Sequence, residues 1–157
     1  MELNTSRGYE TDSSKVLMRL SVIVMDNLVF IPGVWKFCST FYRSQSEALR
    51  LLTLVMVCMQ PAFIIIDHGH FQYNSVSLGL TLLAVLSLLK DRPLVCSFLF
   101  VASLCFKQMS LYHAPVFFLV LLRYAFDKAR GSWLKAMGWV ALIGSVVLLA
   151  FALFFLP

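Results

Sequence analysis

The chain has 157 residues, of which 60% are hydrophobic and only 13% are charged, and its mean hydropathy is +0.83. A soluble domain of this size cannot bury so large an apolar share, so the composition excludes an ordinary soluble fold and indicates an integral membrane protein. The net charge of +5 does not indicate nucleic-acid binding, because the basic residues are spread among the segments between apolar runs instead of forming one face.

The apolar runs are long enough for helices rather than for the shorter strands of a membrane barrel. We therefore predict an all-α integral membrane fold, in which a polar segment at residues 1–15 precedes about six transmembrane helices. The expected spans are residues 16–41, 49–66, 76–89, 94–106, 114–126 and 133–157.

The first segments contain three features of interest. Asn4 opens an N-glycosylation sequon, usable only if this end of the chain is luminal. In the first span, Pro32-Gly33 predicts a kink. Asp26 lies near the middle of that span, where an ionisable group is costly unless it faces protein or water. We expect Asp26 to form an interhelical hydrogen bond, with a catalytic role as the alternative.

A polar octet, Asp67-His68-Gly69-His70-Phe71-Gln72-Tyr73-Asn74, separates the second and third spans and follows a break at Gln60-Pro61. Its residue types suit a metal site, a proton relay or a sugar-phosphate pocket, and they also suit a polar loop at the membrane edge. Two histidines at i and i+2 point about 200° apart on a helix, which is poor geometry for chelating a metal.

The runs on either side of Lys90 are each shorter than the roughly 20 residues of a full span. A re-entrant hairpin would place Lys90 and Arg92 deep in the membrane, at a cost of about 2.5 kcal/mol or more for each. We therefore predict two spans that are extended by their polar ends.

A second polar cluster, Lys107-Gln108-Met109-Ser110-Leu111-Tyr112-His113, follows the fourth span. Lys107 either extends to the lipid head groups or binds a phosphate, whose negative charge a compact ammonium group stabilises. Gln108, Tyr112 and His113 supply hydrogen bonds that a sugar or pyrophosphate needs.

The last span, 133–157, begins with tryptophans suited to the membrane interface, and the absence of a polar tail suggests an incomplete sequence. The cysteines have no CxxC or paired spacing, so we predict neither disulfides nor a zinc site. They are Cys38, Cys58, Cys96 and Cys105.

Six spans place the basic residues on two sides of the membrane. One side holds nine, which are Lys36, Arg43, Arg50, Lys90, Arg92, Arg123, Lys128, Arg130 and Lys135. The other side holds four, which are Arg7, Lys15, Arg19 and Lys107. The positive-inside rule makes the first side cytosolic, so residues 1–15 and both polar clusters are expected on the luminal side, where the clusters can form one site.

Three ordered motifs give the chain a family resemblance over nearly its whole length. They are Ser6-Arg7-Gly8-Tyr9-Glu10, the run from Asp67 to Gly79, and Lys107-Gln108-Met109 with Leu111-Tyr112-His113. Together they closely resemble the endoplasmic-reticulum glucosyltransferases of dolichol-linked oligosaccharide assembly. Gly69, Ser75 and the Lys-Gln-Met run resemble the enzyme that adds the first glucose rather than the one that adds the second.

The resemblance implies a larger polytopic glycosyltransferase fold of the GT-C type. It also implies transfer of glucose from dolichyl phosphate glucose to a mannose hydroxyl of the lipid-linked high-mannose oligosaccharide, forming an α-1,3 linkage for protein N-glycosylation. A β-linked donor and an α-linked product mean inversion, which requires a base on the acceptor and a stabilised phosphate leaving group. No cofactor and no metal are expected.

Family members carry more spans, and their catalytic base, an acidic residue, lies in a first luminal loop that would precede Met1. The resemblance therefore implies that this chain is a segment of a larger enzyme, and that Asp67 matches the second family motif rather than the base. We expect the isolated chain to be inactive.

The expected substrate-binding residues come from the octet and the second cluster. They are Asp67, His68, His70, Gln72, Tyr73, Asn74, Lys107, Gln108, Tyr112 and His113. The expected partners are the dolichol-linked donor and acceptor, membrane lipid and, by association, other N-glycosylation enzymes, but no nucleic acid. Two alternatives stay open: a transporter or channel subunit with an ion path along its acidic residues and histidines, and an inactive truncated product.

Overall fold

The structure is a computed structural model that describes residues 11–70 and 72–155. Within these residues every regular element is helical, which confirms the all-α class. Helices long and apolar enough to cross a membrane occupy Asp12–Phe41, Glu47–Gly69, Gln108–Ala129 and Trp133–Phe155. The Asn4 sequon, the motif at 6–10, most of the 1–15 segment, Phe71 and residues 156–157 lie outside the described ranges.

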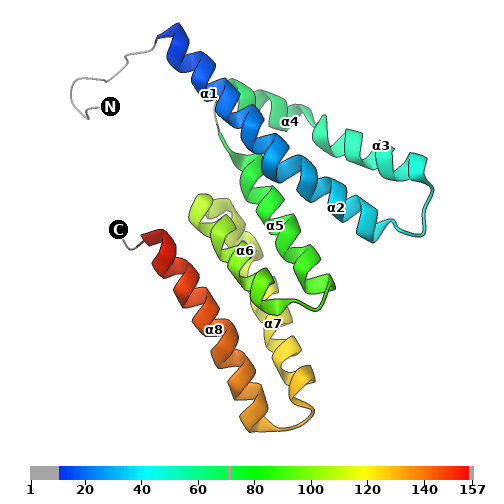
Figure 1. Cartoon of the computed structure of the whole chain (residues 1–157), viewed down its shortest axis with the longest axis vertical. Helices are drawn as coiled ribbons and strands as arrows, with labels where there is room; N and C mark the ends of the chain where they lie inside the picture. The colour runs from blue at the N-terminus through cyan, green and yellow to red at the C-terminus, as the bar shows by residue number, and fades with distance from the viewer. Residues whose placement is uncertain (1–10, 71, 156–157) are drawn as a thin grey trace.

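The first membrane segment is one continuous helical run in three parts (Figure 1). It consists of α1 (Asp12–Met25), the π turn η1 (Asp26–Phe30) and α2 (Ile31–Phe41). The irregularity expected at Pro32-Gly33 therefore lies one turn earlier, in η1. Proline lacks an N–H and crowds the preceding turn, and the wider π turn accommodates both effects.

The second membrane segment is interrupted where the sequence predicts it. α3 (Glu47–Cys58) ends, and the helix restarts at Pro61 as α4 (Pro61–Phe63), which continues into a second π turn, η2 (Ile64–Gly69). The first residues of the polar octet are thus helical rather than part of a loop. A helix satisfies its own backbone groups, which favours it at the edge of a membrane.

The next two helices are short and antiparallel. α5 (Asn74–Leu89) has 16 residues and α6 (Pro93–Phe106) has 14, so two full crossings at this point stay a prediction. Asp91, in the turn between them, adopts a positive φ of 60°. Lys128 donates to the Asp91 carboxylate at 2.7 Å, and this hydrogen bond lowers the pKa of Asp91.

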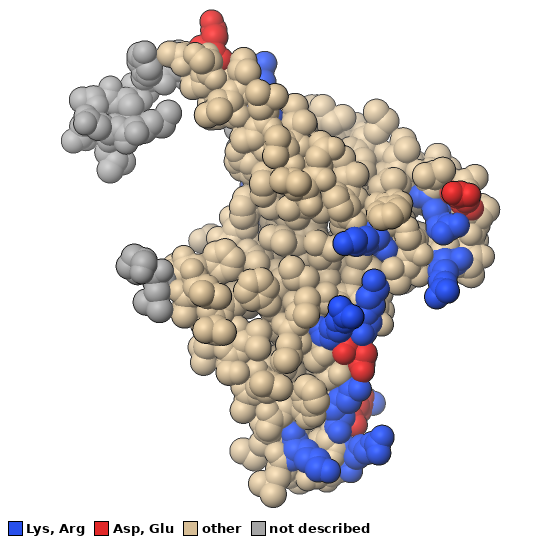
Figure 2. All heavy atoms as spheres, viewed as in Figure 1, with Lys and Arg blue, Asp and Glu red and all other residues tan. Residues whose placement is uncertain are grey.

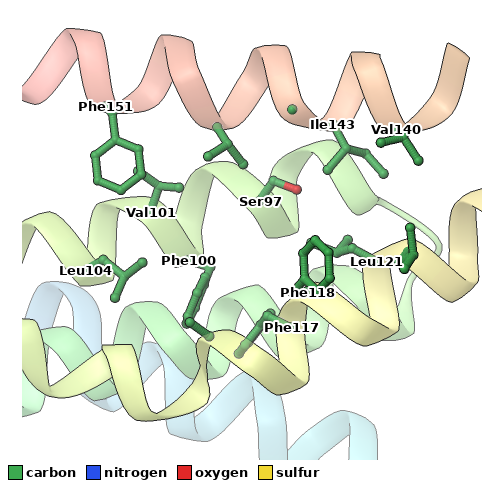
Figure 3. A pocket seen from close by; sticks show the side chains of 14 residues that line it. Ser97, Phe100, Val101, Leu104, Phe117, Phe118, Leu121, Val140, Ile143 and Phe151 are labelled. Atoms are coloured by element: carbon green, nitrogen blue, oxygen red, sulfur yellow. The ribbon is translucent and has the colours of Figure 1, made fainter. Parts of the chain in front are cut away.

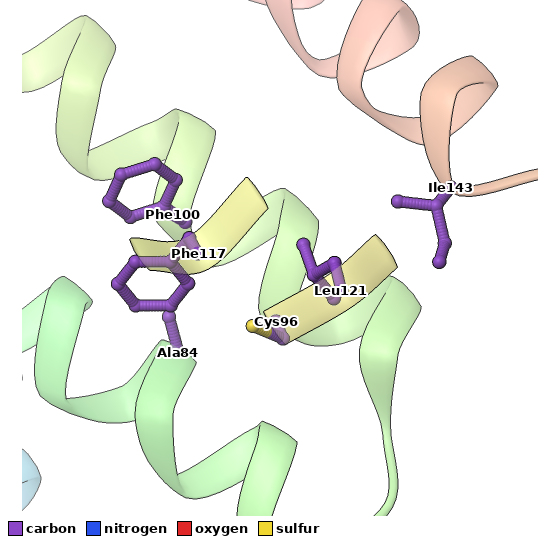
Figure 4. Close-up of a cluster of buried hydrophobic side chains, with 6 residues drawn as sticks. All are labelled: Ala84, Cys96, Phe100, Phe117, Leu121 and Ile143. Carbon is purple, nitrogen blue, oxygen red and sulfur yellow. The ribbon is translucent and has the colours of Figure 1, made fainter. Parts of the chain in front are cut away.

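The last part of the chain packs on α6. A 3-10 turn, η3 (Gln108–His113), leads into α7 (Ala114–Ala129), and α8 (Trp133–Phe155) contacts both α6 and α7. Phe100 and Phe117 stack at the centre of the core, with ring centroids 4.0 Å apart (Figure 4). The buried cluster comprises Ala84, Cys96, Phe100, Phe117, Leu121 and Ile143. The four cysteines are free thiols in the structure.

α5 also packs on the first membrane segment, so it joins the two halves of the bundle. The second buried cluster, Phe30, Val34 and Cys38, packs against Leu78 and Leu82 of α5. Gly79 makes the closest approach, because a Cβ there would lie 2.9 Å from the Phe30 Cα. Small residues allow helices in membranes to pack backbone against backbone.

Basic side chains gather along one side of the molecule, which Figure 2 shows. This side carries the α2–α3, α5–α6 and α7–α8 connections (Figure 1). The nine residues assigned to the cytosolic side lie in these connections or within two helical turns of them. The other connections, including the polar octet and η3, lie at the opposite ends of the same helices.

We predict that Gly79→Ala destabilises the chain by about 1–3 kcal/mol, because its methyl group would meet the backbone of η1, which cannot rotate away. The measurement is thermal unfolding of the purified chain in detergent. Gly138→Ala is the control, since a Cβ at Gly138 meets nothing within 4 Å and alanine favours a helix by up to about 1 kcal/mol. Equal stability of the two variants would contradict the close contact.

Candidate functional site

Two carboxylates, Asp26 and Asp67, each lie on a π turn, and each contacts the first turn of α5. π turns in helices are often found at functional sites. We call the surrounding group the polar junction. It comprises Asp26, Asp67, His68, Gln72, Asn74, Ser75 and Lys107.

Asp67 is fully buried, and both of its oxygens are hydrogen-bonded. One oxygen accepts from the Asn74 side-chain amide at 2.7 Å, and the other accepts from the Ser75 backbone N–H at 2.7 Å. The first N–H groups of a helix have no partner within the helix, and the helix dipole favours an anion there. The carboxylate of η2 thus caps α5, and hydrogen bonds of this charged kind are worth about 1.5–3 kcal/mol each.

Asp26 connects the first membrane segment to the same turn of α5. Its carboxylate accepts a short hydrogen bond from the Ser75 hydroxyl, and it lies 2.9 Å from His68 Nε2. This confirms the expected interhelical hydrogen bond. The Asp26 side chain is 13% exposed and that of His68 is 34% exposed, so His68 connects the carboxylate to the protein surface.

Lys107 joins the two polar clusters that the sequence places on one side of the membrane. It directly follows α6, and its ammonium group donates to the side-chain oxygens of Asn74 and, at 3.1 Å, Gln72. Asn74 is suited to this position, because its amide donates to Asp67 while its oxygen accepts from Lys107. Both acceptors of Lys107 are neutral, so its positive charge is not cancelled by a direct partner in the described part of the chain.

Four buried hydroxyl groups fix the segment that carries Lys107. Ser77 and Thr81 of α5 meet Ser103 of α6 and Ser110 of η3, with oxygen–oxygen distances of 2.7 Å for Ser77–Ser110 and 2.9 Å for Thr81–Ser103. Ser103 also donates to the Ser77 carbonyl at 2.7 Å. In the sequence, Lys107 lies between Ser103 and Ser110. The hydroxyl cluster therefore fixes the position of Lys107 along α5, next to Asn74.

The remaining candidates lie at the surface or pack on other elements. The Tyr73 hydroxyl is 2.6 Å from the Ser21 hydroxyl, and its ring packs edge-on against Phe106, so Tyr73 contacts α1 and α6. The other four make no side-chain hydrogen bond within residues 11–70 and 72–155, and they are exposed. They are His70, Gln108, Tyr112 and His113.

Sequence reasoning placed Asp26 in the bundle but not among the site residues, and it missed Ser75. The signal for Asp26 was present, since an acidic residue in mid-span needs a polar partner. Nothing in the sequence indicates that Ser75 supplies both a hydroxyl and a backbone N–H to two different carboxylates. Within the described ranges, no three His, Cys, Asp or Glu residues lie close enough together to hold a metal ion.

An apolar cavity of about 350 Å³ opens between α6, α7 and α8 (Figure 3). Phenylalanines and aliphatic side chains line it, among them Phe100, Phe118 and Phe151. Its lining includes Leu104, three residues before Lys107, and Ala114, which directly follows His113. An apolar cavity therefore lies next to the segment that carries the cation of the polar junction.

Comparisons with known proteins agree with the motifs. The sequence model of the ALG6, ALG8 glycosyltransferase family matches residues 1–157. A probable dolichyl pyrophosphate Man9GlcNAc2 alpha-1,3-glucosyltransferase of Dictyostelium discoideum is 44% identical over 100% of this chain and 31% of its own length. The Gallus gallus protein named dolichyl pyrophosphate Man9GlcNAc2 alpha-1,3-glucosyltransferase is 43% identical over 99% of this chain and 30% of its own. The chain thus spans about a third of the length of these relatives.

We predict that Asn74→Asp destabilises the chain by about 1–3 kcal/mol, because it places a second carboxylate against the buried Asp67. Adding Asp67→Asn should restore much of the loss, since the new amide can donate to residue 74 and accept from the Ser75 N–H. Thermal unfolding in detergent measures both effects, and Asp127→Asn on the exposed face of α7 is the control. A double variant less stable than Asn74→Asp would contradict the assigned hydrogen bonds.

Proposed function

Because the chain belongs to the ALG6, ALG8 glycosyltransferase family, we propose that it is the substrate-binding part of a dolichyl-phosphate-glucose-dependent α-1,3-glucosyltransferase. The reaction proposed for the full-length enzyme is transfer of glucose to the lipid-linked high-mannose oligosaccharide for protein N-glycosylation. The observation that carries the proposal is Lys107, which belongs to the polar junction and directly follows α6, a helix whose residues Phe100 and Leu104 line the apolar cavity.

The chemistry of the substrate supports this assignment. A dolichyl phosphate sugar has a polar head with one phosphodiester charge and a long hydrocarbon tail. The polar junction offers hydrogen-bonding groups and an ammonium group for the head, and the cavity between α6, α7 and α8 offers an apolar surface for part of the tail.

Lys107 is suited to the leaving group of the reaction. When the glucosyl bond breaks, negative charge develops on the phosphate, and a nearby ammonium group stabilises that charge. Lys107 is held by two neutral amide oxygens rather than by a carboxylate, so little of its field is cancelled. A phosphate that displaces one amide exchanges a neutral partner for a charged one, which favours binding.

The catalytic base is proposed to lie elsewhere in the full-length enzyme. Asp67 is fully buried with both oxygens occupied, and Asp26 is bonded to Ser75 and His68, so neither carboxylate is available to an acceptor hydroxyl. The expectation that the chain alone is inactive stays a prediction. The transporter alternative requires an ion path along Asp26 and Asp67. The hydrogen bonds that occupy both carboxylates give no support to such a path.

We propose a multi-pass location in the endoplasmic reticulum membrane, with the polar junction facing the lumen. The basic residues along the α2–α3, α5–α6 and α7–α8 connections support this orientation, because cytoplasmic loops are enriched in Lys and Arg (Figure 2). The proposed partners are the dolichol-linked donor and acceptor, and association with other N-glycosylation enzymes stays a prediction.

We predict that Lys107→Ala in the full-length enzyme lowers kcat/KM for glucosyl transfer by about 100-fold, because removing one preorganised charge from a developing anion costs roughly 3 kcal/mol. Transfer from dolichyl phosphate glucose in glucosyltransferase-deficient microsomes measures it, with protein level determined in parallel. Lys135→Ala, an exposed lysine at the start of α8, should leave transfer unchanged. Unchanged turnover in Lys107→Ala would remove Lys107 from the site.

Membrane orientation gives a separate prediction. In sealed microsomes, a membrane-impermeant maleimide should label Lys90→Cys without permeabilisation, because the α5–α6 turn is cytosolic. Gln72→Cys and Gln108→Cys should be labelled only after permeabilisation, since both exposed side chains face the lumen. Labelling of Gln72→Cys and Gln108→Cys from opposite sides would exclude a shared site.

A further inference from the structure

The polar junction consists of two hydrogen-bonded segments that meet at Ser75, through its hydroxyl and its backbone N–H, and that have chemically different outer ends. One segment runs from His68 through Asp26 to Ser75, and the other runs from Ser75 through Asp67 and Asn74 to Lys107. At one end, His68 contacts the carboxylate of Asp26. The ammonium group of Lys107, beside neutral amides, forms the other end. A bound head group therefore meets an acceptor-rich end and a cationic end.

The pairing with Asp26 determines which atom of His68 is available to a ligand. An ionised carboxylate only accepts hydrogen bonds, so the Nε2 atom that lies 2.9 Å from it carries the hydrogen. In the neutral ring, Nδ1 then keeps its lone pair and acts as an acceptor. The His68 side chain is one-third exposed, so a ligand can approach the ring.

A sugar hydroxyl suits that acceptor better than a phosphate does. A hydroxyl donates a hydrogen bond to a lone pair, whereas a phosphate oxygen offers another lone pair and adds negative charge close to Asp26 and Asp67. The phosphate is favoured at the Lys107 end, where a positive charge is paired with neutral groups only, as far as the chain is described.

We propose that Nδ1 of His68 accepts a hydrogen bond from a hydroxyl of the glucosyl group of the lipid-linked donor, and that Asp26 is a positioning residue that fixes the tautomer of His68. This inference rests on the proposed function, and it specifies how the sugar phosphate of the donor is oriented in the polar junction. The sugar lies toward His68 and Asp26, and the phosphate lies toward Lys107. His70 and His113 have no such partner in the described ranges to fix their rings.

The test compares a ligand that has the sugar with one that lacks it, in the full-length enzyme. KM is measured for dolichyl phosphate glucose, and the inhibition constant is measured for dolichyl phosphate, the sugar-free product. In Asp26→Asn, the new amide can donate to Nε2 of His68 and forces the hydrogen onto Nδ1, while its oxygen still accepts from Ser75.

Asp26→Asn should raise KM for the donor about tenfold, the equivalent of one hydrogen bond. The inhibition constant of dolichyl phosphate should stay within about twofold. Lys107→Ala should instead raise both constants. Asp26→Glu, which keeps the carboxylate, should recover part of the donor affinity that Asp26→Asn loses. Asn27→Ala is the matched control, because Asn27 is exposed and its side chain bonds only to the Ile23 carbonyl within the described ranges.

A parallel rise of both constants in Asp26→Asn overturns the inference, because it shows that Asp26 supports the fold or the phosphate end. Unchanged constants overturn it as well. If Asp26→Asn lowers the protein level, His68→Phe gives the same comparison and should show the same selective rise in the donor KM. A wild-type enzyme that transfers no glucose overturns the proposed function itself, whereas normal transfer with unselective variants overturns only this inference.

Discussion

The arrangement of the site depends on how one buried negative charge is satisfied. A carboxylate without partners in an apolar interior costs several kcal/mol, and Asp67 is fully buried. The first turn of α5 supplies its two donors, one from the Asn74 side chain and one from the Ser75 backbone. Because one donor belongs to the backbone, satisfying Asp67 also fixes where α5 begins. The side-chain oxygen of Asn74 is then left to accept from Lys107.

Helix packing and the polar contacts support each other along α5. The Asp26–Ser75 hydrogen bond and the close approach of Phe30 to Gly79 lie four residues apart on both helices. They are therefore consecutive turns of one contact between the first membrane segment and α5. A side chain at position 79 would separate the two backbones, and the short Asp26 side chain would no longer reach Ser75. The polar junction thus depends on a glycine that lies one helical turn after Ser75 and is not itself a member of the junction.

Much of this could be expected from the sequence. The charges between apolar runs predict that the octet and Lys107 lie on one side of a membrane, and the cost of a buried carboxylate predicts a partner for Asp26. The hydrogen-bond partners of Asp26 and Asp67 could not be derived from the sequence. A π turn changes which residues share a helix face, and the pattern of apolar residues does not reveal it. The hydroxyl cluster could not be predicted for a different reason. In the sequence, Ser77, Thr81 and Ser103 are indistinguishable from other small residues within apolar runs.

The two π turns also restrict the number of residues that their segments can contain. A π turn holds about one residue more than an α turn, so helical residues before and after it are offset by roughly 100° around the axis. Loss of one residue from Asp26–Phe30 or Ile64–Gly69 would convert the π turn into regular α-helix. The helical residues before the turn would then be rotated about the helix axis relative to those after it. In related sequences, insertions and deletions should therefore be accepted in the connections between helices, while the residue count within these two segments is kept.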